Sequence, residues 1–378
     1  MPTIAPAEPA AQAAPMVLAN RFINASAEHI EPFYDSGQVL TAGQSVDNIE
    51  VAANGYLSGI LIRIDVVSAG NAAAVAIRQD APFNVLSLVR LADINGANLF
   101  GPMDGWDWSQ AAKYGGYRYE SRPGYSPSYA PLLTGAVGGG GSGTFLLRLP
   151  VSVNQRDAFG ALPNMNAASS LKLYFAINSL ANIFSVLPTN APTFRVRASI
   201  ETWLVPQGED SNGIPNTLTP PALGCYQRWL KSTFPVVAGQ NTFRMPNVSN
   251  YLRTMVFVFR SAAFTRNDSN FPSTMLLNLD GYARDSIRDY EVRQRMYEDY
   301  GYLEAVAASG LGIETGVFVW NWSHELDGKP GYETRELYVV TNSATRLELT
   351  GTFGASGTLD VLWNDVVVPD GVGDYKAA

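Results

Sequence analysis

The chain has 378 residues and a net charge of −8, and charged residues make up only 16% of it, below the share in a typical soluble domain. Its 26 cations form no basic run, which argues against direct nucleic-acid binding, and its length exceeds what one hydrophobic core usually supports. With one cysteine, Cys225, and two histidines, the chain has the residues for neither an internal disulfide framework nor a cysteine- or histidine-based metal centre.

The first residues are expected to form an N-terminal arm, 1–34, that is partly flexible. Residues 1–15 are rich in Ala and Pro, and they lack the charged and apolar regions of a signal peptide. Residues 16–30 carry apolar side chains at spacings that suit a short helix. No apolar run reaches the roughly 18 residues of a membrane-spanning helix, so the sequence predicts none.

From about residue 37 onward, apolar and polar residues alternate with period two, which predicts strands with one buried face. In 194–201 the apolar residues stand at even positions and the polar ones at odd positions. The run 255–259 is apolar at every position, which predicts a strand covered on both faces. Clear helical spacing is rare and is best in 285–300.

Two stretches without regular pattern divide the chain. Residues 207–221 are polar and rich in Pro, Gly and Asn, which is typical of a linker. The stretch 114–143 is long enough inside a domain to predict a functional loop. We therefore expect a first β-domain over 35–206, a second over 222–370 and a C-terminal tail over 371–378.

The two halves repeat one pattern. The letters AGQ at 42–44 return at 238–240, and the Tyr-Leu pair at 56–57 returns at 251–252. Further strand candidates match in the same order: 85–91 with 274–279, 144–149 with 315–322, 171–173 with 347–349, and 200–206 with 359–369. The ordered set favours two tandem β-sandwiches of one plan over two unrelated β-domains with chance similarity.

The sequence offers few candidates for catalysis. His29 and His324 stand apart in polar, turn-like segments, so neither is expected in a Ser-His-Asp site. The carboxylates Asp104 and Asp107 beside Trp106 and Trp108 suit a glycosidase pair with a sugar-stacking platform, or a loop-capping pair beside two buried aromatics.

Three other polar motifs are interpreted as loops. NDSN at 267–270 suits a calcium site or, more simply, a turn. GGGGSG at 138–143 lacks the Lys-Ser/Thr pair of a phosphate loop and is predicted to be a flexible loop. Asp365 and Asp370 are predicted to be turn residues flanking the last strand.

The cations are 21 Arg against 5 Lys, and the chain has 18 Tyr and 7 Trp. Protein–protein interfaces favour Arg, Tyr and Trp and disfavour Lys, although a GC-rich genome also favours Arg. With no catalytic set, the sequence predicts a structural or binding protein that is not an enzyme and needs no cofactor.

Four segments resemble the double jelly-roll major capsid proteins, and among these the tectivirus type of tailless double-stranded-DNA phages with an internal membrane. The first three are 54–69, 82–108 and 146–178, which resemble strands and Asp-containing turns of the first sandwich. The fourth is 284–300, which stands where such proteins carry an Arg-rich helix between strands.

The resemblance implies an all-β fold of two tandem eight-stranded jelly-roll β-sandwiches with short helical insertions. It implies homotrimers of pseudo-hexagonal outline that tile an icosahedral shell, because two similar sandwiches per chain give six similar corners. Expected partners are neighbouring trimers, penton and minor membrane proteins, and the internal viral membrane through the N-terminal arm. The protein would be made in the host cytoplasm and reside in the virion.

Four tyrosines in the long loop are candidates for a trimer interface or for the outer surface: Tyr117, Tyr119, Tyr125 and Tyr129. The main alternative function is a tandem jelly-roll carbohydrate-binding or glycan-processing protein that uses Trp106 and Trp108 as its platform. A receptor-binding spike or fibre is a third possibility, but the sequence shows no repetitive shaft.

Overall fold

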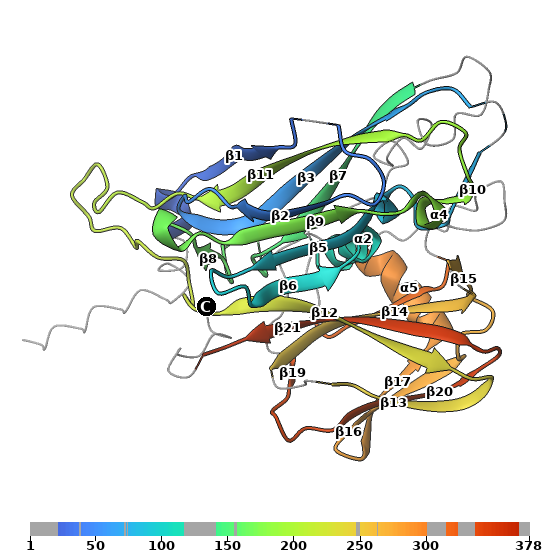
Figure 1. Ribbon diagram of the computed structural model, residues 1–378. Coiled ribbons are helices and arrows are strands. Elements are labelled where there is room, and N and C mark those ends of the chain that lie inside the picture. Colours follow the sequence, from blue (N-terminus) through green and yellow to red (C-terminus); the bar gives the residue numbers. More distant parts are fainter. Residues whose placement is uncertain are drawn as a thin grey trace, which may run out of the picture.

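The computed structural model describes residues 22–37, 39–71, 73, 75–116, 141–154, 157–246, 250–262, 264–300, 315–323 and 337–369. Figure 1 shows two β-sandwiches stacked one on the other, the first coloured blue to green and the second yellow to red. Among the described residues, no helix is long and apolar enough to cross a membrane.

The first sandwich is a jelly roll of two antiparallel four-stranded sheets, with the short β8 joined to one of them. One sheet has the order β1-β11-β3-β7 and the other β2-β9-β5-β6. Its main strands are β1 (Glu28–Asp35), β2 (Ser45–Glu50), β3 (Tyr56–Ser68), β5 (Leu86–Ala92), β6 (Asn98–Met103), β7 (Gly141–Pro150), β9 (Lys172–Ile177) and β11 (Thr193–Trp203). Its short elements are β4 (Ala76–Ile77), η1 (Phe83–Val85), α2 (Gly105–Tyr114), β8 (Leu162–Pro163), η3 (Ala167–Ser169), α4 (Leu180–Ile183) and β10 (Phe184–Val186).

The second sandwich repeats this plan. One sheet contains β12-β21-β14 with β15, β18 and β19 paired to β14, and the other has the order β13-β20-β16-β17. Its main strands are β12 (Tyr226–Val236), β13 (Gly239–Arg244), β14 (Tyr251–Ala262), β16 (Thr274–Leu279), β17 (Tyr282–Arg288), β18 (Val317–Asn321), β20 (Leu347–Phe353) and β21 (Gly357–Val367). Its short elements are β15 (Thr265–Arg266), α5 (Asp289–Tyr300) and β19 (Val339–Val340).

The two jelly rolls agree strand for strand. Each AGQ comes at or just before the second strand of its roll, and each Tyr-Leu pair opens the third. The helices agree as well, since α2 follows β6 and precedes β7, while α5 follows β17 and precedes β18. The predicted fold class, two tandem eight-stranded jelly rolls with short helical insertions, is confirmed.

The hydrophobic cores follow the alternation in the sequence. In β11, Phe194, Val196, Ala198 and Ile200 are buried between the two sheets of the first roll, as their even positions predict. The run 255–259 in β14 is buried at every position, since the first roll covers the outer face of this strand. One cluster of buried apolar side chains continues from the first roll into the second.

Several local expectations were wrong. Strand β1 pairs with β11 from Glu28, so the first sheet begins inside the expected arm. Gly141 to Gly143 form the start of β7 opposite β3, because a glycine run next to a strand edge can still donate and accept ladder hydrogen bonds. Asp365 lies inside β21, where its buried carboxylate binds Arg228 at 2.7 Å.

Candidate functional site

Helix α2 lies on the side of the first jelly roll that faces the second (Figure 1), where it contacts β14 while β6 packs against β12. Asp104 caps its N-terminus, because its Oδ1 accepts a hydrogen bond from the Asp107 backbone N at 2.8 Å. All ten residues of the helix are buried. Gly105 permits this close packing, since a Cβ at that position would stand 2.3 Å from the Phe83 carbonyl oxygen.

A buried ion pair joins α2 to the second roll. Lys231 of β12 places its Nζ 2.6 Å from Asp107 Oδ2 and 3.6 Å from Asp360 Oδ2 of β21. Asp107 is fully buried, and its Oδ1 has no hydrogen-bond partner among the described residues. The pair therefore connects the rolls through a fully buried carboxylate and a lysine whose side chain is 23% exposed.

A second buried cluster lies beside the first. Asp80, in the turn before η1, binds Arg266 of β15 at 2.9 Å and Arg260 of β14 at 2.8 Å. Both guanidinium groups stand over the Trp106 ring, at 5.1 Å for Arg260 and 5.0 Å for Arg266 from its centre. Trp106 thus packs under two cations of the other roll.

Burial and the charges around Lys231 shift the pKa values of Asp107 and of Lys231 itself. Burial first, and then the nearby charge of Asp104, raise the pKa of Asp107 to about 7, although Lys231 opposes this shift. Burial alone would lower the pKa of Lys231, but the charges of Asp107, Asp104 and Asp360 raise it above its ordinary value. Lys231 therefore stays charged at neutral pH, whereas Asp107 titrates there.

Hydrogen bonds to the backbone extend the contact on either side. Gln227 Nε2 donates to the Ser152 carbonyl oxygen at 2.7 Å, and Gln227 Oε1 accepts from Asn364 Nδ2 at 2.8 Å. Arg253 donates to the Gly115 carbonyl oxygen at 2.9 Å. The two rolls are thereby held as one unit by polar groups that are buried and paired.

The alternative of a sugar platform at Trp106 and Trp108 is wrong. Trp106 and Trp108 are 4% and 0% exposed, and the Trp108 indole N–H donates to the Val89 carbonyl oxygen at 3.0 Å. Neither ring has a face free to stack on a sugar. The carboxylates beside them serve as a helix cap and an ion pair, which corresponds to the alternative interpretation of capping Asp residues beside buried aromatics.

Other sequence candidates have local partners or fall outside the described residues. Asp268 of NDSN binds Arg293 at 2.6 Å, as a turn residue tied to α5. His29 lies on β1 with its Nε2 3.9 Å from Glu31. Outside the described residues lie the four candidate tyrosines, Tyr117, Tyr119, Tyr125 and Tyr129, together with His324 and Asp370.

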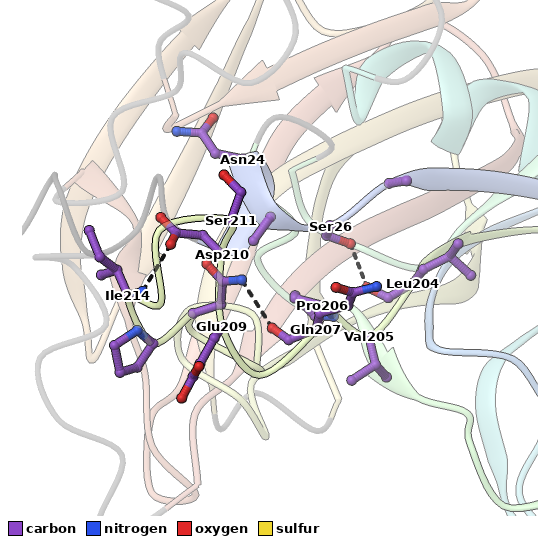
Figure 2. A pocket seen from close by; sticks show the side chains of 14 residues that line it. Asn24, Ser26, Leu204, Val205, Pro206, Gln207, Glu209, Asp210, Ser211 and Ile214 are labelled. Carbon is purple, nitrogen blue, oxygen red and sulfur yellow. Dashed lines mark hydrogen bonds between the residues drawn. The ribbon is translucent and has the colours of Figure 1, made fainter.

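An open hollow lies where residues 24–27 meet residues 204–216 (Figure 2). Its volume is about 570 Å³, and its lining mixes polar side chains, such as Asn24, Glu209 and Asp210, with aliphatic ones. Ser26 donates to the Leu204 carbonyl oxygen, and Asp210 Oδ1 accepts from the Ile214 backbone N at 2.9 Å, both drawn in Figure 2. Ser26 and Asp210 thus each bond to a backbone group within the chain. In the part of the chain that the structure describes, no group of three His, Cys, Asp or Glu residues is placed to hold a metal ion.

Sequence reasoning missed the charged contact between the rolls. Asp80, Lys231, Arg260, Arg266 and Asp360 are ordinary residues in strands and turns, and no spacing marks them as a cluster. One signal was available, because charged residues inside otherwise apolar strands are rarely buried unless paired.

No protein-family model matches this sequence, and the comparison with curated proteins found no relative. Solved structures do match. The crystal structure of the STIV MCP, a major capsid protein, superposes with a TM-score of 0.61 over 91% of this chain and 97% of that one, at 12% identity. The PBCV-1 virus capsid gives 0.61 over 90% and 93% at 14% identity, and the Faustovirus major capsid protein gives 0.55 over 91% and 90% at 8% identity. The chain therefore has the fold of double jelly-roll capsid proteins of viruses.

Proposed function

We propose that the chain is a viral major capsid protein that assembles into pseudo-hexagonal homotrimers, which tile an icosahedral shell. The observation that carries this proposal is the extent of the structural match, which takes in about nine-tenths of this chain and of each capsid protein reported above. A match confined to one jelly roll would not distinguish a capsid protein from the many binding proteins that use this sandwich.

The contact between the rolls supports the same function. A shell subunit must hold two similar lobes at a fixed angle, because six such lobes in three chains have to close a ring. Asp80 with Arg260 and Asp107 with Lys231 tie the lobes through buried charges, and α2 fills the space between them. Such a contact resists hinge motion better than the polar, hydrated contact common between domains.

The finer assignment rests on the sequence resemblance in 54–69, 82–108, 146–178 and 284–300. On that ground we place the protein in the tectivirus-like lineage of tailless phages with an internal membrane. Its further partners would be penton and minor membrane proteins, and the part of the arm that precedes β1 would contact the membrane. The protein would be made in the host cytoplasm and reside in the virion shell.

The first test is the mass of the purified protein in solution, by size-exclusion chromatography with light scattering. We expect three times the mass of one chain, stable to dilution, and hexagonal outlines in negative-stain images. A monomer at every concentration would overturn the proposal of a preassembled trimer. For the finer assignment, flotation with phospholipid vesicles should carry the full chain but not a chain lacking residues 1–21.

A further inference from the structure

Two buried side chains of α2 carry oxygen atoms that have no hydrogen-bond partner among the described residues. They are Asp107 Oδ1 and Gln110 Oε1, in residues that are 0% and 6% exposed. The other carboxylate oxygen, Asp107 Oδ2, accepts from Lys231 Nζ at 2.6 Å. The amide nitrogen, Gln110 Nε2, donates to Ser109 Oγ at 3.4 Å. A buried acceptor without a donor costs free energy, so each of the two oxygens needs a physical explanation.

The two oxygens belong to one face of the helix. Gln110 follows Asp107 by three residues and Trp106 by four, and residues at these spacings are neighbours on a helix surface. Asp107 and Trp106 both contact the second roll, through Lys231 and through Arg260. Helical side chains lean toward the N-terminus, so the Gln110 amide leans toward the Asp107 carboxylate. Gln and Asp at such a spacing are close enough to share a hydrogen bond.

The charges around Asp107 do not balance when it is ionised. Three other carboxylates and three cations face it or its partners, and they come from six places in the fold. These are Asp104 at the start of α2, Asp80 before η1, Asp360 of β21, Lys231 of β12, Arg260 of β14 and Arg266 of β15. An ionised Asp107 adds a fourth negative charge to three balanced pairs. Because a buried charge without its opposite is costly, the group favours a proton.

A proton on Asp107 explains both observations. It turns Oδ1 into an O–H donor, which Gln110 Oε1 can accept, so both unpaired oxygens gain a partner. It also leaves three carboxylates against three cations. Burial, followed by the charge of Asp104, raises the pKa of Asp107 to about 7, in agreement with a proton held there under mildly acid conditions. A metal ion fits less well, because two oxygens fill only a small part of the coordination shell of a hard cation.

We propose that Asp107 and Gln110 hold a proton between them, and that this proton is a pH-sensitive switch for the contact between α2 and the second jelly roll. With the proton bound, Oδ1–H donates to Gln110 Oε1 while Oδ2 keeps Lys231. Without it, two acceptors face each other in a buried place, and only opening of the contact lets water reach the carboxylate. Gln110 is the positioning residue. The switch lies within one chain, so it does not depend on the proposed capsid function.

The contact should open more readily as pH rises. In the closed contact Asp107 binds its proton tightly, whereas in an opened, hydrated contact its carboxyl has its ordinary pKa near 4. The open fraction therefore rises about tenfold for each pH unit between these two values and levels off above about 7. Burial also raises the pKa of Asp104, so the experiment has to separate the two carboxyls.

Infrared difference spectra of the full chain between pH 5 and pH 8 test for the proton directly. We expect the C=O band of a protonated carboxylic acid at the lower pH only. Asp107→Asn should remove this band, which assigns it to Asp107 and not to Asp104. The absence of such a band from the wild type, or its persistence in Asp107→Asn, would overturn the proposal.

The role of Gln110 has a test of its own sign. Gln110→Leu removes the acceptor of the proton, so the pH midpoint of the band should fall by about one pH unit. If Gln110 donated its amide N–H to an ionised Asp107, the same variant would raise the midpoint. A midpoint that stays or rises therefore contradicts the assignment. Gln294→Leu is the matched control, since Gln294 is an exposed residue of α5 that donates to Glu298 at 2.7 Å.

Hydrogen–deuterium exchange measures the opening itself. After correction for the intrinsic pH dependence of amide exchange, residues 105–114 should exchange about tenfold faster for each pH unit between 5 and 7. Residues 194–201 of β11 should stay protected, which shows that the jelly roll is folded. Asp107→Asn should make exchange in 105–114 independent of pH, because its amide donates to Gln110 at every pH. Parallel pH curves for this variant and the wild type would overturn the switch, whereas the mass in solution decides the capsid function separately.

Discussion

Tyr114 and Tyr300, the last residues of α2 and α5, pack edge to face across the contact between the two jelly rolls, with ring centres 5.1 Å apart. The Tyr300 hydroxyl donates to the Tyr114 carbonyl oxygen at 3.2 Å and accepts from Asn321 Nδ2 at 2.6 Å. The two helices hold equivalent positions in the two rolls, so one pair of equivalent residues joins the duplicated halves.

Replacement of Tyr300 by Phe should lower the free energy of unfolding by about 1–2 kcal/mol, because it leaves a buried carbonyl oxygen and an amide group without this partner. The measurement is urea unfolding followed by tryptophan fluorescence at fixed protein concentration. Tyr282→Phe is the control, since that side chain is 80% exposed and should change stability little. Equal effects of the two substitutions would contradict a role for the Tyr300 hydroxyl.

Replacement of Asp80 by Asn should lower the free energy of unfolding by about 3–5 kcal/mol, because it removes the carboxylate that the buried Arg266 binds and leaves Arg260 with Asp360 alone. Asp35→Asn is the matched control, since Asp35 pairs with Arg195 where both side chains are about two-fifths exposed. That exposed pair should contribute no more than about 1 kcal/mol to the free energy of unfolding. Thermal unfolding of the two variants at one concentration compares them, and a milder effect of Asp80→Asn would show that the rolls do not depend on this cluster.

Stability should fall as pH rises from about 5 to 7.5. The pKa of Asp107 is raised to about 7 in the folded chain, from 3.8 ordinarily, so the folded state binds the proton more tightly. As pH rises from the ordinary pKa to the raised one, the free energy of unfolding therefore falls, by on the order of 4 kcal/mol at most. Stability contributed by Asp35, whose pKa is lowered by its hydrogen bond from Arg195, is complete above its ordinary pKa and does not change in this window.

Asp107→Asn separates this effect from others, because the amide cannot lose a proton there. We expect the unfolding midpoint of this variant to change less between pH 5 and 7.5 than that of the wild type. Parallel curves for the two proteins would assign the pH dependence to other groups.

Trp106→Ala should destabilise the chain by about 3–5 kcal/mol, because it opens a cavity beneath Arg260 and Arg266. It should leave any signal on a glycan array unchanged, since the ring is 4% exposed. Selective loss of glycan binding with unchanged stability would restore the carbohydrate-binding alternative.

The sequence predicted the strands because a strand with one buried face repeats every two residues, and this holds wherever the strand later packs. Residues 194–201 show this, since their alternating burial depends only on which face meets the core. The doubled order of strand candidates likewise predicted two β-sandwiches of one plan, because equivalent strands need equivalent patterns.

Helix α2 was not predicted from the sequence. Its residues, 105–114, mix Trp, Asp, Lys and Ala without a polar side, because the second roll covers the side that water would otherwise contact. The sequence alone therefore indicated a loop whose Asp residues act as caps beside buried aromatics, with a sugar site as the alternative.

What the sequence by itself determined is the strand plan and its duplication, since both depend on local alternation. Only the tertiary structure decided which charges meet. Asp107 and Lys231 lie 124 residues apart, and Arg266 and Asp80 lie 186 apart, so nothing in their local sequence selects these partners. They meet because one roll packs its edge against the sheet face of the other, and buried charges are tolerated there only when each finds its opposite.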